Sequence, residues 1–317
     1  MKHNIRITLL LLAMFLFAQL LGLAVIHAYS PQQEQVVNAT TGAIEDVITT
    51  PPLPYGMQPP EMQPRDAFTS IIISIIIATL ILFFLMKKKA NLLLRIWLFS
   101  VVTISMAIVF NAFLSKLSFL SNVQMLAFVL AFPLAFYKIF LPNKITHNLT
   151  ELLIYPGIAA VFVPILNIWA AAGLLVAIAL YDVYAVWHSG FMQKLANFQM
   201  QQLKVFTGFF VPYVAKKDRA KIARIKALPQ KERGRILKRL KIKVNLAILG
   251  GGDVTFPLIF AGVILRASGW IPALLISVIS TVALFLLFAF AKKGKFYPAM
   301  LFLSPACILA WLVGMLF

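Results

Sequence analysis

Apolar residues follow one another in nine long blocks instead of alternating with polar residues at helical spacing. Each block holds roughly 16 to 23 residues, enough for a helix to cross a hydrocarbon core about 30 Å thick. The pattern predicts an all-α polytopic membrane protein with nine transmembrane helices. We expect the spans at residues 8–28, 67–86, 96–114, 117–137, 152–166, 168–187, 244–265, 270–291 and 298–317.

The division between the fifth and sixth spans depends on length and on two helix-breaking residues. Residues 145–180 carry a single charge, Glu151, and could form one block. A helix over these 36 residues would be about 54 Å long, too long for one crossing. Pro164 and Asn167 supply the break. Glu151 lies at a span end, where we expect its side chain to reach the membrane interface.

The orientation follows from the basic residues between the spans. If the N-terminus is cytoplasmic, 26 of the 29 Lys and Arg residues lie on the cytoplasmic side, and only Arg65, Lys116 and Arg266 lie outside. Positive residues gather on the cytoplasmic side of membrane proteins. The N-terminus is therefore predicted to be cytoplasmic and the C-terminus extracytoplasmic. We expect the first span to remain uncleaved, because its apolar stretch exceeds a usual signal-peptide core.

Two long loops divide the chain into three parts. Residues 1–187 hold spans one to six and include a proline-rich extracytoplasmic loop, 29–66, expected to be extended and poorly ordered. Residues 188–243 form a basic cytoplasmic loop, predicted to lie as a helix on anionic lipid headgroups, with substrate gating as the alternative. Residues 244–317 hold spans seven to nine.

Composition excludes several classes of function. The net charge of +19 comes from residues between apolar blocks, a distribution typical of membrane orientation and not of nucleic-acid binding. The single cysteine, Cys307, excludes an internal disulfide and a cysteine-based zinc cluster. The sequence contains no His-Glu-x-x-His, so a zinc protease is not expected. We expect no metal and no cofactor.

Only two acidic residues lie well inside the predicted spans, Asp182 in the sixth and Asp253 in the seventh. A charged side chain inside the bilayer costs about 2.5–3.5 kcal/mol on insertion scales, so each is a candidate functional residue. The helix rise places them roughly 10 and 15 Å from the cytoplasmic end of their spans. Two antiparallel neighbouring helices thus carry carboxylates at similar depth.

Two carboxylates in contact share a proton and titrate as a unit. One can act as general base on a water while the other, protonated, polarises a carbonyl, which is the chemistry of metal-free peptide hydrolysis. Gly250, Gly251 and Gly252 precede Asp253 and would weaken a helix there by about 1 kcal/mol each. Their missing side chains allow a partner helix or an extended substrate to approach closely.

Three motifs carry a resemblance to a known family. Tyr181-Asp182, Gly250-Gly251-Gly252-Asp253 and Pro298-Ala299-Met300 resemble the YD, GxGD and PAL motifs of the presenilin and signal peptide peptidase family of intramembrane aspartyl proteases. They occur in order on the sixth, seventh and ninth spans, so the resemblance covers nearly the whole chain. Gly251 and Met300 depart from the leucines that are commoner at those positions.

The resemblance implies a function and roles for these residues. Asp182 and Asp253 are the expected catalytic pair. Tyr181, the three glycines and Pro298-Ala299-Met300 are expected to shape the site and position substrate. The chain looks most like a microbial, archaeal-type presenilin homologue in the cell membrane. Its expected partners are transmembrane-helix protein substrates and the lipid bilayer, without nucleic acid.

Two alternative functions stay open on the residues alone. In an ion-coupled transporter or channel, Asp182 and Asp253 would bind a cation or relay protons. A prepilin-peptidase-like protease also uses GxGD, but it has fewer spans and places an acid near the cytoplasmic loop. The ordered set of three motifs favours the intramembrane protease. The substrate, the cleavage position and the oligomeric state do not follow from the sequence.

The predicted orientation can be tested by cysteine labelling. Single cysteines at Val183, Trp187 and Leu249, in a Cys307→Ser background, should react with a water-soluble thiol reagent added to the cytoplasmic face. Both carboxylates are expected nearer that face, and hydrolysis requires water to reach them. Slow labelling from outside is the matched control. Preferential labelling from outside would reverse the topology.

Overall fold

The computed structural model describes residues 5–37, 44–57, 64–117, 120–188, 206–214, 244–291 and 297–316. Within this part of the chain the main elements are nine α-helices and two pairs of strands. The helices are α1 (Ile5–Ala28), α2 (Pro64–Lys87), α3 (Asn91–Leu114), α4 (Val123–Phe140), α5 (Lys144–Phe162), α6 (Ile168–Val183), α10 (Gly251–Ser268), α11 (Trp270–Phe290) and α12 (Met300–Gly314).

Eight of these helices are long and apolar enough to cross a membrane, and α12 is a shorter apolar helix. The all-α polytopic fold predicted from the sequence is confirmed. The break between the fifth and sixth spans lies at Pro164, within a short 3-10 helix, η2 (Val163–Ile165). Asn167 then caps α6, its side chain accepting a hydrogen bond of 2.7 Å from the Ala170 N–H.

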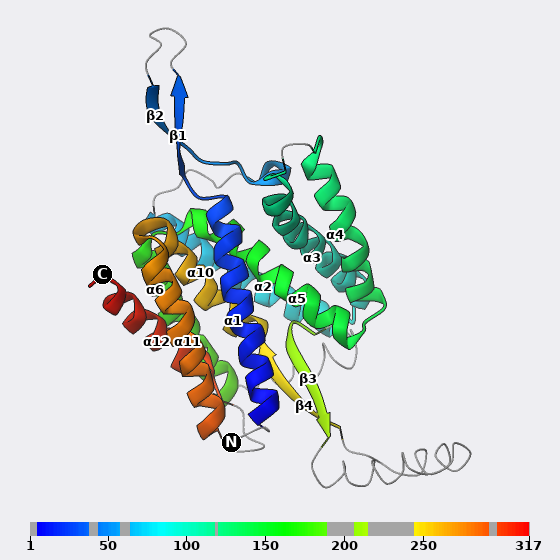
Figure 1. Cartoon of the computed structure of the whole chain (residues 1–317). Coiled ribbons are helices and arrows are strands. Elements are labelled where there is room, and N and C mark those ends of the chain that lie inside the picture. The colour runs from blue at the N-terminus through cyan, green and yellow to red at the C-terminus, as the bar shows by residue number, and fades with distance from the viewer. Residues whose placement is uncertain are drawn as a thin grey trace, which may run out of the picture.

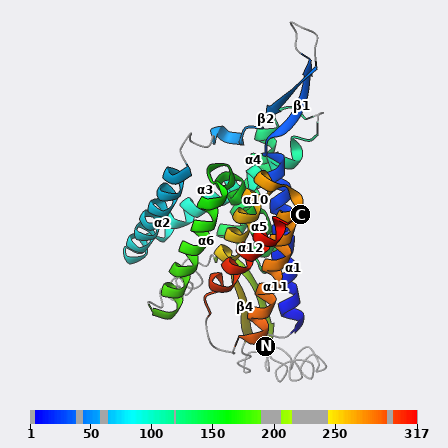
Figure 2. The same cartoon turned by 90° about the vertical axis from the view of Figure 1, so that its left-hand side faces the viewer.

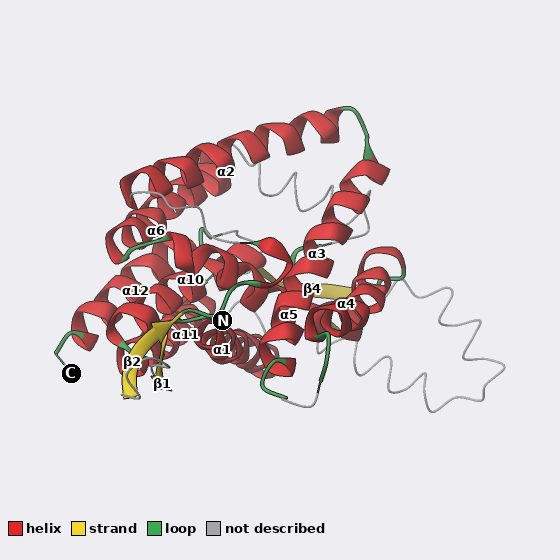
Figure 3. Ribbon diagram, turned by 90° about the horizontal axis from the view of Figure 1, so that it is seen from above, coloured by secondary structure: helices red, strands yellow, loops and turns green. Residues whose placement is uncertain are grey.

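The helices are unequally packed. The largest core joins buried side chains of α1, α5, α6, α10, α11 and α12, while α3 and α4 lie together at one side (Figure 1). Helix α2 stands at the edge of the bundle, where it contacts α6 and α3 (Figures 2 and 3). Only 6% of its membrane-spanning window is buried, so most of its apolar surface is left for lipid.

Two antiparallel strand pairs lie at opposite ends of the bundle (Figure 1). Strand β1 (Gln32–Val37) pairs with β2 (Ile44–Thr49) beyond the end of α1. Strand β3 (Gly208–Val214) pairs with β4 (Val244–Gly250) at the end where α1 begins. The 29–66 loop, expected to be extended and poorly ordered, holds this strand pair and a 3-10 helix, η1 (Pro54–Gly56), in its described part.

The seventh span begins later than the sequence predicts. Residues 244–250 form β4 and not the first two turns of a helix, so α10 starts at Gly251. A short apolar run fits either structure, and pairing with a strand about 40 residues away decides between them. The pairing also buries Leu249, which is only 2% exposed, so a cysteine there will react slowly from either side. The predicted helix on the headgroups lies outside the described residues.

Glu151 does not reach the membrane interface, contrary to the sequence-based expectation. Helix α5 begins at Lys144, two turns earlier than predicted, and Glu151 is 1% exposed. Its carboxylate forms an ion pair with Lys138 of α4, which is equally buried. Pairing satisfies two charges that would each be costly alone in this environment.

Helices α3 and α5 cross closely at a glycine. A Cβ atom at Gly157 would collide with the backbone carbonyl of Ser105, so no side chain fits without moving the helices apart. We predict that Gly157→Ala destabilises the fold by about 1–3 kcal/mol, the usual cost of overpacking. Thermal unfolding in detergent measures the change.

Gly173→Ala is the matched control. A Cβ there meets only the edge of the Phe68 ring, at 3.3 Å, and that side chain can move. The alanine also improves helix propensity. Equal stability of the two variants would contradict the close α3–α5 crossing.

Candidate active site

Asp182 lies near the end of α6, where the helix changes its winding. Residues Tyr184–His188 continue as one π-helical turn, a distortion that is frequent at functional sites. The Asp182 side chain points into the protein, since the residue is 6% exposed among otherwise apolar neighbours. A buried carboxylate needs hydrogen-bond donors or a positive charge beside it.

The donors come from the start of α12. The backbone N–H of Met300 donates to Asp182 Oδ2 at 3.1 Å, and the N–H of Ala299 also bonds to this carboxylate. Ala299 is the N-cap of α12, so both groups belong to those that a helix N-terminus leaves without intrahelical partners. The partial positive charge of the helix end adds to the attraction.

Asp253 lies in the first turn of α10, not some ten residues into a helix as expected from the sequence. Gly250 ends β4 and is the N-cap of α10, so Asp253 is the third residue of the helix. Its carboxylate bonds back to the N–H of Gly250, the reciprocal half of a capping box. Asp253 is thus also held by a backbone donor at a helix N-terminus.

The fold brings the two carboxylates together. Helix α10 packs against both α6 and α12. Asp182 is close enough to Asp253 for the two charges to interact. Asp253 follows β4 directly, so it lies at the end of the bundle that carries the β3–β4 pair. The basic residues between the spans predict that this end is cytoplasmic. The two carboxylates therefore lie near each other where α6, α10 and α12 meet.

The three glycines occupy a strand-to-helix junction, and each has a different neighbour. A Cβ on Gly250 would lie 3.1 Å from Asp253 Oδ2, and one on Gly251 would lie 3.1 Å from the Tyr155 ring. A Cβ on Gly252 would meet only the Phe256 ring, at 3.5 Å, an ordinary contact. Close approach to the acid and to α5 thus accounts for two of the three glycines.

The remaining predicted residues surround the pair at different depths. Pro298, Ala299 and Met300 are buried, and their contribution to Asp182 is through the backbone. Tyr181 is 37% exposed, although its phenol still interacts electrostatically with Asp182. Adjacent residues on a helix do not share a face, which explains this difference between Tyr181 and Asp182.

Two polar residues near the site are missing from the sequence-based prediction. Gln19 of α1 is fully buried and donates through Nε2 to the carbonyl of Val254, at 2.9 Å. Tyr155 of α5 is buried against Gly251. A glutamine inside an apolar span is itself a signal of an internal contact, whereas nothing in the sequence distinguishes Tyr155 from a packing residue.

Comparison with known proteins agrees with this geometry. Residues 55–317 match the family described as signal-peptide peptidase, presenilin aspartyl protease. The fold is similar to a presenilin family intramembrane aspartate protease in its C222 crystal form, with a TM-score of 0.58, 18% identity and 98% coverage of both chains. The P2 crystal form gives a TM-score of 0.57, 18% identity and 96% coverage of both.

A search of curated protein sequences gave no significant match. At 18% identity the solved structures support the fold alone, but the family match covers most of the chain. Its apolar helices make it a multi-pass integral membrane protein. The chain belongs to the signal-peptide peptidase and presenilin aspartyl protease family and is an intramembrane aspartic endopeptidase.

Proposed function

We propose that Asp182 and Asp253 together activate a water molecule and hydrolyse peptide bonds within transmembrane segments of membrane-protein substrates. The observation that carries this proposal is that two carboxylates, each bonded to a backbone N–H at a helix N-terminus, meet at the junction of α6, α10 and α12. Because the protein lies in the bilayer, the peptide that can reach the two carboxylates is a membrane-spanning segment of the substrate.

The chemistry needs one proton shared by the pair. The ionised carboxylate removes a proton from water as its oxygen attacks the scissile carbonyl carbon, and the protonated carboxylate donates to the carbonyl oxygen. Collapse of the tetrahedral intermediate breaks the C–N bond: one carboxyl gives its proton to the leaving amine, and a hydroxyl of the intermediate returns a proton to the other carboxylate. The pair thus carries one negative charge before and after each turnover.

Backbone donors support that negative charge in a dry environment. Met300 and Ala299 donate to Asp182, and Gly250 donates to Asp253. Fixed N–H groups need no reorganisation during the reaction, which makes them effective where water is scarce. The alternative of a cation-coupled transporter is less well supported, because membership of the protease family is shown and no feature of a transporter is.

Neutralising either aspartate should abolish proteolysis. Asp182→Asn and Asp253→Asn each keep the size and hydrogen-bonding capacity of the side chain but cannot share a proton. Cleavage of a single-span model substrate by the purified protein should fall at least about 1,000-fold in each variant. Unchanged thermal unfolding is the control for folding, and turnover like that of the native protein in either variant would exclude the pair mechanism.

The backbone N–H of Met300 should matter more than its side chain. A hydrogen bond to a charged group contributes about 1.5–3 kcal/mol, so Met300→Pro should lower kcat by roughly 10- to 150-fold. Proline is tolerated at the first position of a helix, so α12 should still form. Cleavage assays at saturating substrate give the comparison.

Met300→Leu is the conservative control, expected within about threefold of the native activity because the volume is conserved. Met300→Ala shortens the side chain and keeps the N–H, and it should therefore retain more activity than Met300→Pro. The reverse order would show that the side chain, and not the donor, supports Asp182.

A further inference from the structure

One face of α5 is polar at the end of the helix that approaches the β3–β4 pair. The residues follow at helical spacing, so they project to the same side. Three of them are 1–3% exposed, inside a span that is otherwise apolar. Polar side chains buried in a membrane span are costly and usually have a specific partner. This α5 polar face consists of His147, Asn148, Glu151 and Tyr155.

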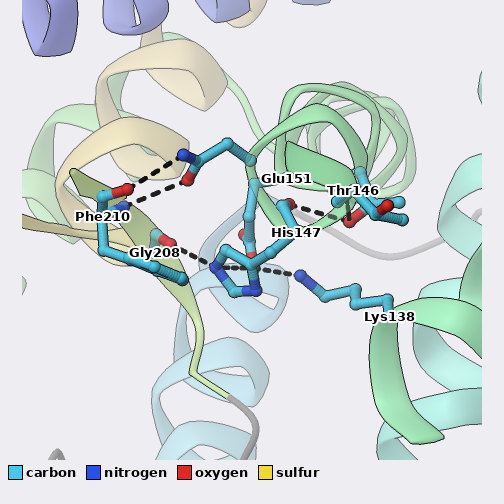
Figure 4. A network of polar contacts seen from close by, with 8 residues as sticks. Lys138, Thr146, His147, Glu151, Gly208 and Phe210 are labelled. Atoms are coloured by element: carbon cyan, nitrogen blue, oxygen red, sulfur yellow. Dashed lines mark hydrogen bonds and ion pairs between the residues drawn. The ribbon is translucent and has the colours of Figure 1, made fainter. Parts of the chain in front are cut away.

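The α5 polar face holds the outer edge of strand β3 (Figure 4). Asn148 makes two hydrogen bonds to the backbone of Phe210, donating to its carbonyl at 2.9 Å and accepting from its N–H at 3.1 Å. His147 Nε2 contacts the carbonyl oxygen of Gly208 at 2.8 Å. Together these side chains occupy the edge as a neighbouring strand would.

The alternation of strand bonds extends this result. Both backbone groups of Phe210 face Asn148, on the side away from β4. Backbone groups alternate between the two sides of a strand, so those of Gly208 and Pro212 face outward, away from β4, as well. Gly208 is bonded by His147, and Pro212 has no N–H to offer. Of the five outward backbone groups from Gly208 to Pro212, Asn148 and His147 bond three: both groups of Phe210 and the carbonyl of Gly208.

A buried ion pair fixes the base of the α5 polar face. Glu151 is paired with Lys138 of α4, and its Oε1 lies 3.7 Å from His147 Nε2. Figure 4 shows these three side chains together, with His147 between the ion pair and the strand. The ion pair therefore restricts the ring of His147, which in turn contacts Gly208.

Tyr155 extends the α5 polar face to the candidate active site. One helical turn beyond Glu151, its ring packs edge-on against Phe209 of β3, with 5.3 Å between ring centroids. The same ring lies against Gly251, at the start of α10. Its phenol interacts electrostatically with both Glu151 and Asp253. Tyr155 thus lies between the ion pair and the aspartate.

The strand held by α5 determines where α10 begins. Gly208 pairs with Gly250, and the N–H of Gly251 donates to the carbonyl of Thr207 at 3.4 Å. Gly208 has a φ of 145°, so position 208, at this end of the pairing, favours glycine. Gly250 and Gly251 are therefore tied to β3 and to Thr207 just before it, and β3 is tied to α5.

We propose that the α5 polar face, with Lys138, is a positioning device that holds β3 and, through it, the Gly250–Asp253 segment at the distance from Asp182 that catalysis requires. The proposal rests on the proposed function, because the alignment of Asp253 with Asp182 matters for hydrolysis only if the two act as a pair. The residues of this face are positioning residues and do not touch the substrate.

The decisive variants remove contacts without removing volume. Asn148→Leu deletes both bonds to Phe210, and Tyr155→Phe deletes only a hydroxyl. Misplacing a reacting group by about 1 Å can cost about 100-fold in rate. We expect kcat to fall by at least about tenfold for Asn148→Leu and about threefold for Tyr155→Phe, with KM within about twofold of the native value.

Thr150→Val is the matched control on the same helix. Thr150 is 1% exposed, like Glu151, but its hydroxyl bonds only to backbone carbonyls of its own helix. Its kcat should stay within about twofold of the native value. Lys138→Met should lower kcat, and the neutral pair Lys138→Met/Glu151→Gln should recover part of the loss, since no buried charge is then left unpaired.

A second readout is independent of proteolysis. In a Cys307→Ser background, the rate of disulfide formation by the cysteine pair Asp182→Cys/Asp253→Cys under mild oxidation reports how closely the two positions approach. Added Asn148→Leu should slow its formation by at least about fivefold, and Thr150→Val should not. If native protein does not cleave substrate but the cross-link responds to Asn148→Leu, the proposed function fails and the positioning inference stands.

Two results would overturn the inference. One is native kcat together with a native cross-linking rate in Asn148→Leu. The other is an equal loss in Asn148→Leu and Thr150→Val, which would indicate general damage to α5. If Asn148→Leu does not fold, the same two measurements on Tyr155→Phe and on the neutral Lys138–Glu151 pair decide the question.

Discussion

The need to stabilise negative charge at membrane depth governs the design of this protein. Two acidic side chains lie where water is scarce, and the structure places backbone N–H groups beside both. Each set of donors comes from the first turn of a helix, α12 for Asp182 and α10 for Asp253. No basic side chain is needed beside either acid, and a basic partner would hold both carboxylates ionised, which suits a proton-sharing pair badly.

This arrangement places strong demands on the backbone around the site. A helix N-terminus must begin at the level of each acid, so the chain before it cannot be helical. Strand β4 meets this requirement for α10, and Gly250 allows the strand to turn into the helix beside the Asp253 carboxylate. The strand in turn needs a partner, β3, and β3 needs its outer edge covered. The polar residues of α5 and the buried Lys138–Glu151 pair are therefore consequences of where α10 begins.

Much of this could be predicted from the sequence, and the failures have clear causes. Asp182 and Asp253 stand out because charge inside an apolar block is rare. Pro164 and Asn167 mark the helix break because both residue types favour turns and helix ends over a continuing helix. The strand at 244–250 was missed because an apolar run of seven residues fits either a strand or a helix, and its partner is distant in sequence. Glu151 was misplaced for a different reason: a span defined by apolar residues alone began too late, so its buried partner on α4 was not sought.

The hydrogen bond from Met300 to Asp182 has a consequence for how the protein is made. The two residues are 118 positions apart in the chain. At synthesis rates of about 5–20 residues per second, α6 is complete roughly 6 to 24 seconds before the donor on α12 exists. Throughout that interval Asp182 lacks the amides that hold it, and the pair with Asp253 has no finished surroundings. In the proposed mechanism, a newly made chain therefore gains proteolytic activity only once α12 is in place.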